Sequence, residues 1–118
     1  MERRTKIFGV ALLLLVLIDL PWLLFIGETA QKLVTRIQGS PIELRYVPAL
    51  VVYLALAYLV MNTESPTEAF KVGVAVYAVY DFTNLAMFKN YTLSFAIMDS
   101  LWGGVLMATV RYALDRIF

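Results

Sequence analysis

The sequence predicts an all-α fold, an integral membrane four-helix bundle with a short interfacial helix between its first and second helices. The chain of 118 residues is 61% hydrophobic and only 16% charged, whereas soluble domains carry about 25% charged residues. Its apolar residues gather in long stretches, each close to the ~17–25 residues that a spanning helix needs. These stretches lack the period-two alternation that is typical of membrane barrels.

Four apolar stretches are the predicted spanning helices, and together they form one domain, residues 1–118. The stretches cover residues 7–26, 45–62, 69–88 and 93–114. Pro21 is expected to bend the first helix, and both Pro21 and Pro48 are expected to release backbone carbonyls. In the fourth stretch, Gly103-Gly104 predicts a seam where another helix packs closely.

A short interfacial helix is predicted within the first linker, residues 27–44. Gly39-Ser40-Pro41 marks a break in this linker. Before the break, residues 28–38 place apolar side chains on one helical face and charged side chains, beginning with Glu28, on another. A segment with two such faces is expected to lie in the membrane interface.

The remaining linkers carry helix-start signals. In the second linker, residues 63–68, Thr63 or Ser65 can cap the next helix and Pro66 suits its first turn. The third linker, residues 89–92, is short.

The basic residues indicate an orientation. An even number of spanning helices puts both termini on one side, and the side richer in Lys and Arg faces the cytoplasm. The side of the termini carries Arg3, Arg4, Lys6, Lys71, Arg111 and Arg116, and the opposite side carries Lys32, Arg36, Arg45 and Lys89. Both termini are therefore predicted to be cytoplasmic. At the end of the fourth helix, Arg111, Asp115 and Arg116 are interpreted as a solvated anchor.

The residue types that are missing exclude several kinds of chemistry. The chain has no Cys and no His, which removes thiolate nucleophiles, disulfides and the commonest general base and metal ligand. We predict no metal site and no cofactor. A formal net charge of +1 gives no case for nucleic acid, so membrane lipids are the expected partners.

Three aspartates, Asp19, Asp81 and Asp99, lie inside predicted spanning helices. A carboxylate near the bilayer centre costs roughly 2.5–3.5 kcal/mol on insertion scales. Counting from the nearest predicted helix end puts all three about 10 Å below the same membrane surface. Because no Lys or Arg shares that depth, bound protons or a cation are expected to compensate the charge.

Polar neighbours extend this cluster. Tyr77 and Asn84 lie four residues before and three residues after Asp81, on its helical face. The predicted proton- or ion-binding residues are Asp19, Asp81, Asp99, Asn84, Tyr77 and Tyr53. The aromatic residues Trp22 and Trp102 are interpreted as packing residues or hydrogen-bond donors. Tyr91 is assigned to the interfacial belt of aromatic side chains.

Three functions remain open at this point. The first is proton or cation binding and transport by a channel or transporter, with a homo-oligomer widening the narrow pore of four helices. The second is a membrane-embedded lipid-modifying enzyme. Its candidate catalytic residues are Asp81, Asp99 and Asp19, and Lys89 and Arg45 would hold a lipid headgroup. The third is an accessory membrane subunit whose aspartates only hold helices together.

Several short motifs resemble one family. Tyr80-Asp81-Phe82-Thr83-Asn84-Leu85-Ala86, followed by Lys89, and Asp99-Ser100-Leu101-Trp102-Gly103 carry the resemblance. Asp19-Leu20-Pro21-Trp22 and Val47-Pro48-Ala49-Leu50 fit the same pattern. Together they resemble the small predicted membrane proteins catalogued as domain of unknown function 2177. This resemblance covers nearly the whole chain and implies a four-helix integral membrane protein, but it implies no established activity.

Overall fold

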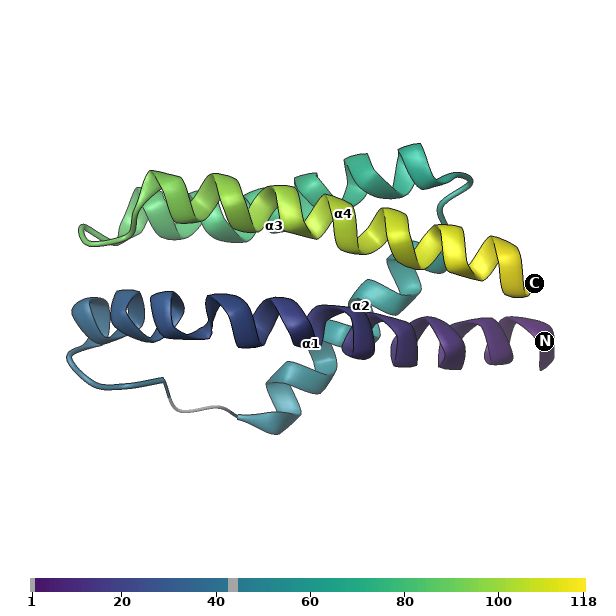
Figure 1. The fold of residues 1–118 in the computed structure, drawn as a ribbon, viewed down its shortest axis with the longest axis horizontal. Coiled ribbons are helices and arrows are strands. Elements are labelled where there is room, and N and C mark those ends of the chain that lie inside the picture. The colour runs from purple at the N-terminus through teal and green to yellow at the C-terminus, as the bar shows by residue number, and fades with distance from the viewer. Residues whose placement is uncertain (1, 43–44) are drawn as a thin grey trace.

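The computed structural model describes residues 2–42 and 45–118, and these residues form four α-helices and no strand (Figure 1). The helices are α1 (Glu2–Gln38), α2 (Tyr46–Met61), α3 (Pro66–Met87) and α4 (Leu93–Ile117). The all-α prediction is confirmed, with one helix for each apolar stretch. The end of the predicted first linker, residues 43–44, lies outside the described residues.

Helix α1 is longer than predicted because the expected interfacial helix is its direct continuation. The helix runs from Glu2 to Gln38 and includes both Pro21 and residues 28–38. The expectation of a separate short helix between the first and second helices is therefore wrong. A change from apolar to amphipathic composition alters which faces of the helix meet water, but it does not interrupt the backbone hydrogen bonds that continue the helix. The predicted break is confirmed, since Gly39 has a φ of +78°, a conformation that favours glycine.

Helix α2 begins after Arg45, so Pro48 lies in its first turn. The N–H groups of a first turn have no partner within the helix. Pro48 therefore releases no carbonyl of α2, contrary to the expectation from the sequence. The starts of the next two helices follow the predicted signals. The Ser65 hydroxyl accepts from the Glu68 N–H at 3.1 Å, ahead of Pro66, and Thr92 caps α4.

Helices α3 and α4 form the most closely packed pair, whereas α3 touches α1 and α2 little. A Cβ placed on Gly104 would lie 2.5 Å from Val74 Cγ2, and one placed on Gly73 would overlap the backbone of Gly103. These glycines let the two backbones approach each other, so the predicted Gly103-Gly104 seam is confirmed. Figure 1 shows α2 crossing α1 obliquely and both termini at the same end of the molecule.

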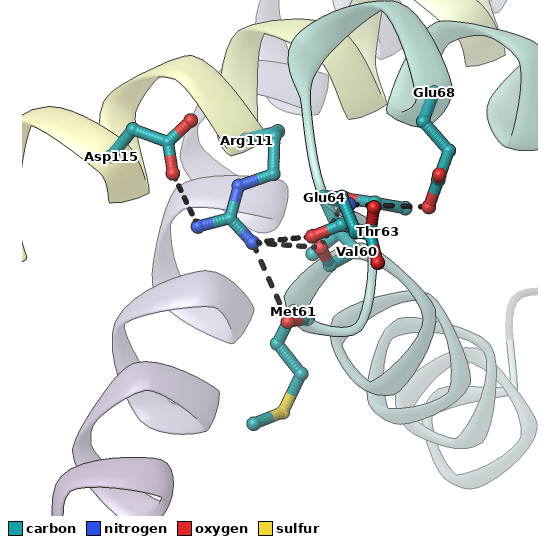
Figure 2. Close-up of polar contacts among 7 residues, drawn as sticks. All are labelled: Val60, Met61, Thr63, Glu64, Glu68, Arg111 and Asp115. Atoms are coloured by element: carbon teal, nitrogen blue, oxygen red, sulfur yellow. Dashed lines mark hydrogen bonds and ion pairs between the residues drawn. The ribbon is translucent and has the colours of Figure 1, made fainter.

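Arg111 of α4 holds the C-terminal end of α2 (Figure 2). Its Nη1 donates to three carbonyls, those of Val60 at 3.3 Å, Met61 at 3.4 Å and Thr63 at 3.2 Å. Its Nη2 donates to Asp115 at 2.6 Å. A guanidinium at this position meets the partial negative charge of the last carbonyls of a helix. Since the Arg111 side chain is only 13% exposed, its interpretation as part of a solvated anchor is wrong.

The buried core is apolar and lies toward the end of the molecule that holds the termini. Its largest members are Leu15, Leu56, Val60, Leu106, Met107, Val110 and Leu114. The outward faces are also apolar, with exposed side chains such as Leu24 and Phe25 on α1, Val47 on α2 and Val79 on α3. Of the helices in the described residues, α1 and α4 are long and apolar enough to cross a membrane by length and composition.

The α3–α4 seam predicts a stability difference between two glycine substitutions. Gly103→Ala is expected to lower the free energy of unfolding by about 1–3 kcal/mol, because its Cβ would overlap the ring of Tyr77. Gly9→Ala on α1 is the matched control, since nothing lies within 4 Å of its Cβ position. That change is expected to be neutral or to stabilise by up to about 1 kcal/mol. Denaturation followed by circular dichroism measures both, and equal midpoints would contradict a tight seam.

Candidate functional site

Asp19 lies near the middle of α1 and is only 5% exposed. Tyr53 of α2 donates its hydroxyl to Oδ2 at 2.5 Å, and Trp102 of α4 donates its Nε1–H to Oδ1 at 2.7 Å. Both oxygens of this carboxyl are therefore paired, each with a different helix. Asp19 joins α1, α2 and α4 through hydrogen bonds that a buried carboxylate needs.

Two Asp-x-x-Trp segments face each other across α1 and α4. Trp102 donates to Asp19, and Trp22 lies within hydrogen-bonding reach of Asp99. The two indole rings stack between them, with centroids 5.1 Å apart and planes 10° apart. In each segment the indole follows the carboxyl by about one helical turn. Because α1 and α4 run in opposite directions (Figure 1), each carboxyl meets the indole of the other helix. We call these four residues the tryptophan clasp.

Asp81 and Asp99 form a second unit, which we call the carboxyl pair. Asp81 is fully buried in α3, and its carboxyl lies within hydrogen-bonding reach of that of Asp99. Its Oδ1 accepts from the Tyr91 hydroxyl at 2.6 Å, but its Oδ2 has no donor among the described residues. Two ionised carboxylates at this separation would repel each other, and an unpaired buried oxygen is costly. A proton shared between the two groups removes the repulsion.

Tyr91 lies in the loop between α3 and α4 and is the outermost member of the site. Its ring packs edge-on against Phe95, with centroids 5.7 Å apart, and its hydroxyl is within hydrogen-bonding reach of Asn84. Burial, followed by the hydrogen bond to Asp81, raises the pKa of the Tyr91 phenol above its ordinary value. The phenol therefore stays protonated and can donate. The sequence assigned this residue to the interfacial belt because it lies beyond the helix that carries Asp81.

The three aspartates lie near one another in the bundle. Asp19 is bonded to Trp102, which lies one turn further along α4 than Asp99, a step of about 4.5 Å. The common membrane depth of the three carboxyls stays a prediction. The end of the first helix from which the depth of Asp19 was counted, residue 26, is not where the helix ends, because α1 continues to Gln38.

The end of α1 lies instead beside the α3–α4 loop. There the Asn90 side chain donates to the Arg36 carbonyl at 3.2 Å. From this end inward the site forms a polar row of Tyr91, Asp81, Asp99, Asp19 and Tyr53.

The other predicted polar residues differ in where the structure places them. Tyr77 lies within electrostatic reach of all three aspartates and of Tyr53, and Asn84 reaches the row through Tyr91. Lys89 and Arg45 are both exposed. Lys89 lies in the α3–α4 loop, and Arg45 precedes α2. Their role at a lipid headgroup stays a prediction.

A groove with a volume of about 420 Å³ opens between α2 and α3 and reaches the carboxyl pair. It is lined by Val52, Leu56, Val76, Tyr77, Tyr80 and Asp99. The wall is mainly apolar and aromatic, and Asp99 provides the one carboxyl among its lining residues. A concave, mainly apolar site with a few polar groups is typical of small-molecule binding.

Comparison with known families identifies one match. The sequence model of a family described as "Predicted membrane protein (DUF2177)" matches residues 4–114, a range that contains the whole polar row. No curated protein and no solved structure matches the chain.

The pairing of Tyr53 with Asp19 predicts a difference between two tyrosines of α2. Tyr53→Phe removes the donor to Asp19 Oδ2, and leaving a buried carboxyl oxygen without a donor is expected to cost about 1–3 kcal/mol. Tyr58→Phe is the control, because this side chain is 61% exposed, and it is expected to change stability by less than about 0.5 kcal/mol. Denaturation midpoints measure both changes. Equal losses would show that Asp19 does not depend on α2.

Proposed function

The chain belongs to the family of predicted membrane proteins catalogued as DUF2177, and we propose that it is a multi-pass membrane protein that binds and transfers protons as the coupling site of a carrier. The observation that carries this proposal is the carboxyl pair. Asp81 and Asp99 lie within hydrogen-bonding reach of each other inside the bundle, and neither forms an ion pair among the described residues. Ionisable residues in such positions mark proton relays and substrate pathways in membrane proteins.

The outer surface supports a multi-pass arrangement. Helices α1 and α4 have the length and composition of spans, and α3 packs closely against α4. Exposed apolar side chains, including Val79 and Tyr80 of α3, would be stable against lipid and unfavourable in water. Both termini lie at one end (Figure 1), together with the basic residues near them, which favours a cytoplasmic location for that end.

A proton fits the site better than a metal ion does. No three acidic side chains of the described residues converge closely enough to coordinate a metal. A contacting pair of carboxyls, in contrast, needs only one proton to become a hydrogen-bonded unit. Tyr91 connects this unit to the α3–α4 loop through its bond to Asp81.

The polar row supports a carrier and not an open channel. It runs from Tyr91 to Tyr53 and ends against the apolar core. Beyond Tyr53, side chains such as Leu15 and Met107 are fully buried and offer no hydrogen-bonding path to the end with the termini. The row is complete within one chain, so proton binding does not require a second copy. The lipid-modifying alternative has less support, because no Lys or Arg among the described residues lines the groove that reaches Asp99.

The absence of cysteine from the chain permits a direct test of topology. Single cysteines introduced at Glu2, Asn90 and Phe118 can be labelled with a membrane-impermeant maleimide in intact cells and in inverted vesicles. The cysteines at residues 2 and 118 are expected to react from the cytoplasmic side, and the cysteine at residue 90 from the opposite side. Labelling of all three from one side would contradict the proposed multi-pass arrangement.

Proton binding is tested by infrared difference spectra between acidic and alkaline pH. The wild type is expected to show the C=O stretch of a protonated carboxyl that loses its proton as the pH rises. Asp81→Asn and Asp99→Asn should each weaken this band and shift the pH at which it disappears, because each removes one of the two carboxyls that share a proton. Glu64→Gln is the control, since Glu64 is exposed in the α2–α3 loop. A wild-type spectrum without a protonated carboxyl band would refute the proposal.

A further inference from the structure

We propose that the groove between α2 and α3 binds a lipophilic monovalent cation, which replaces one proton on the carboxyl pair. This inference rests on the proposed function, because Asp99 belongs both to the pair and to the groove. It adds the chemical class of the carried molecule, which is a bulky organic ammonium or phosphonium ion.

The wall of the groove determines the shape and polarity of the ligand. Val52, Leu56 and Val76 provide apolar contact, and the rings of Tyr77 and Tyr80 can face a cation. A volume of about 420 Å³ lies within the range of roughly 300–1,000 Å³ that drug-sized ligands occupy. A small hydrated ion would lose its water here without gaining ligands, whereas an organic cation has little hydration to lose.

The charge of the carboxyl pair determines the sign of the ligand. One shared proton removes the repulsion within the pair but leaves a single negative charge, and burial without a basic partner favours a second proton that makes the empty pair neutral. Loss of this second proton leaves the single negative charge, with the other proton shared between Asp81 and Asp99. No Lys or Arg among the described residues pairs with either group. A monovalent cation can therefore compensate that charge, so the cation and the released proton compete for the same site.

The organic cation and the proton reach the carboxyl pair from different directions. The groove opens sideways past the exposed side chains of Val52 and Tyr80, which face lipid in the proposed arrangement. The proton has a separate route from Asp99 to Asp81 and then to the Tyr91 hydroxyl at the α3–α4 loop. A cation that enters from the bilayer can thus displace a proton toward the aqueous end of the site.

Two ions of nearly the same shape and opposite charge provide the test. Tetraphenylphosphonium and tetraphenylborate are titrated calorimetrically into the full chain in lipid nanodiscs, in buffers of different ionisation enthalpy. The phosphonium ion is expected to bind with release of about one proton, and the borate ion is expected not to bind. Quenching of Trp22, which lies beside Asp99, provides a second signal.

Three variants test whether phosphonium binding depends on the Asp99 carboxyl and on the groove. Asp99→Asn should weaken phosphonium binding by at least about tenfold, the equivalent of about 1.4 kcal/mol. Leu56→Trp fills the groove and should weaken binding comparably while the infrared carboxyl band remains. Glu64→Gln should change neither.

Each contrary result has a defined meaning. Equal binding of both ions, or phosphonium binding that is unaffected by Asp99→Asn, would show that the groove holds only an apolar chain and would overturn the inference. A wild type that keeps its carboxyl band but does not bind the phosphonium ion would overturn the inference and leave proton binding intact. Absence of the band would instead remove the proposed function.

Discussion

The burial of three carboxyl groups away from basic partners is the constraint on which the rest of the structure depends. Among the described residues, none of Asp19, Asp81 and Asp99 forms an ion pair, so each depends on neutral donors or on a proton. The donors are Tyr53, Trp102, Trp22 and Tyr91, and each comes from an element other than the one that carries its aspartate. The hydrogen bonds that stabilise these carboxyl groups in an apolar interior therefore also determine which helices pack against each other.

Local signals in the sequence predicted the helices well, because hydropathy, caps and glycines act over a few residues. The apolar stretches, the stop at Gly39 and the cap at Ser65 all appear in the structure. The acids were identifiable because a carboxylate contrasts sharply with its apolar surroundings. The tryptophan clasp also had a signal, since the same Asp-x-x-Trp spacing occurs twice. Recognising it required the knowledge that α1 and α4 are antiparallel neighbours, which hydropathy does not provide.

The predictions that failed depended on where elements end and meet in space. Hydropathy falls after residue 26, but the backbone of α1 continues to Gln38, so the expected interfacial helix is not a separate element. Arg111 resembled a surface anchor because its carbonyl partners, such as that of Val60, lie about 50 residues away in sequence. Tyr91 was set aside for a similar reason, since it joins the site through a turn and not through a helical face.

The three aspartates look equivalent in the sequence, but their hydrogen bonds divide them into two kinds. Asp19 has a donor on each oxygen, and both donors bind it to other helices, so its natural role is to hold α2 and α4 against α1. Asp81 has an oxygen with no donor, and that oxygen belongs to the group that touches Asp99. An unsatisfied buried polar atom in a native structure calls for a chemical explanation. The groove reaches Asp99 and not Asp19, so the incompletely paired carboxyls are also the accessible ones. The structural role therefore belongs mainly to Asp19, and the chemical role belongs to the pair of Asp81 and Asp99.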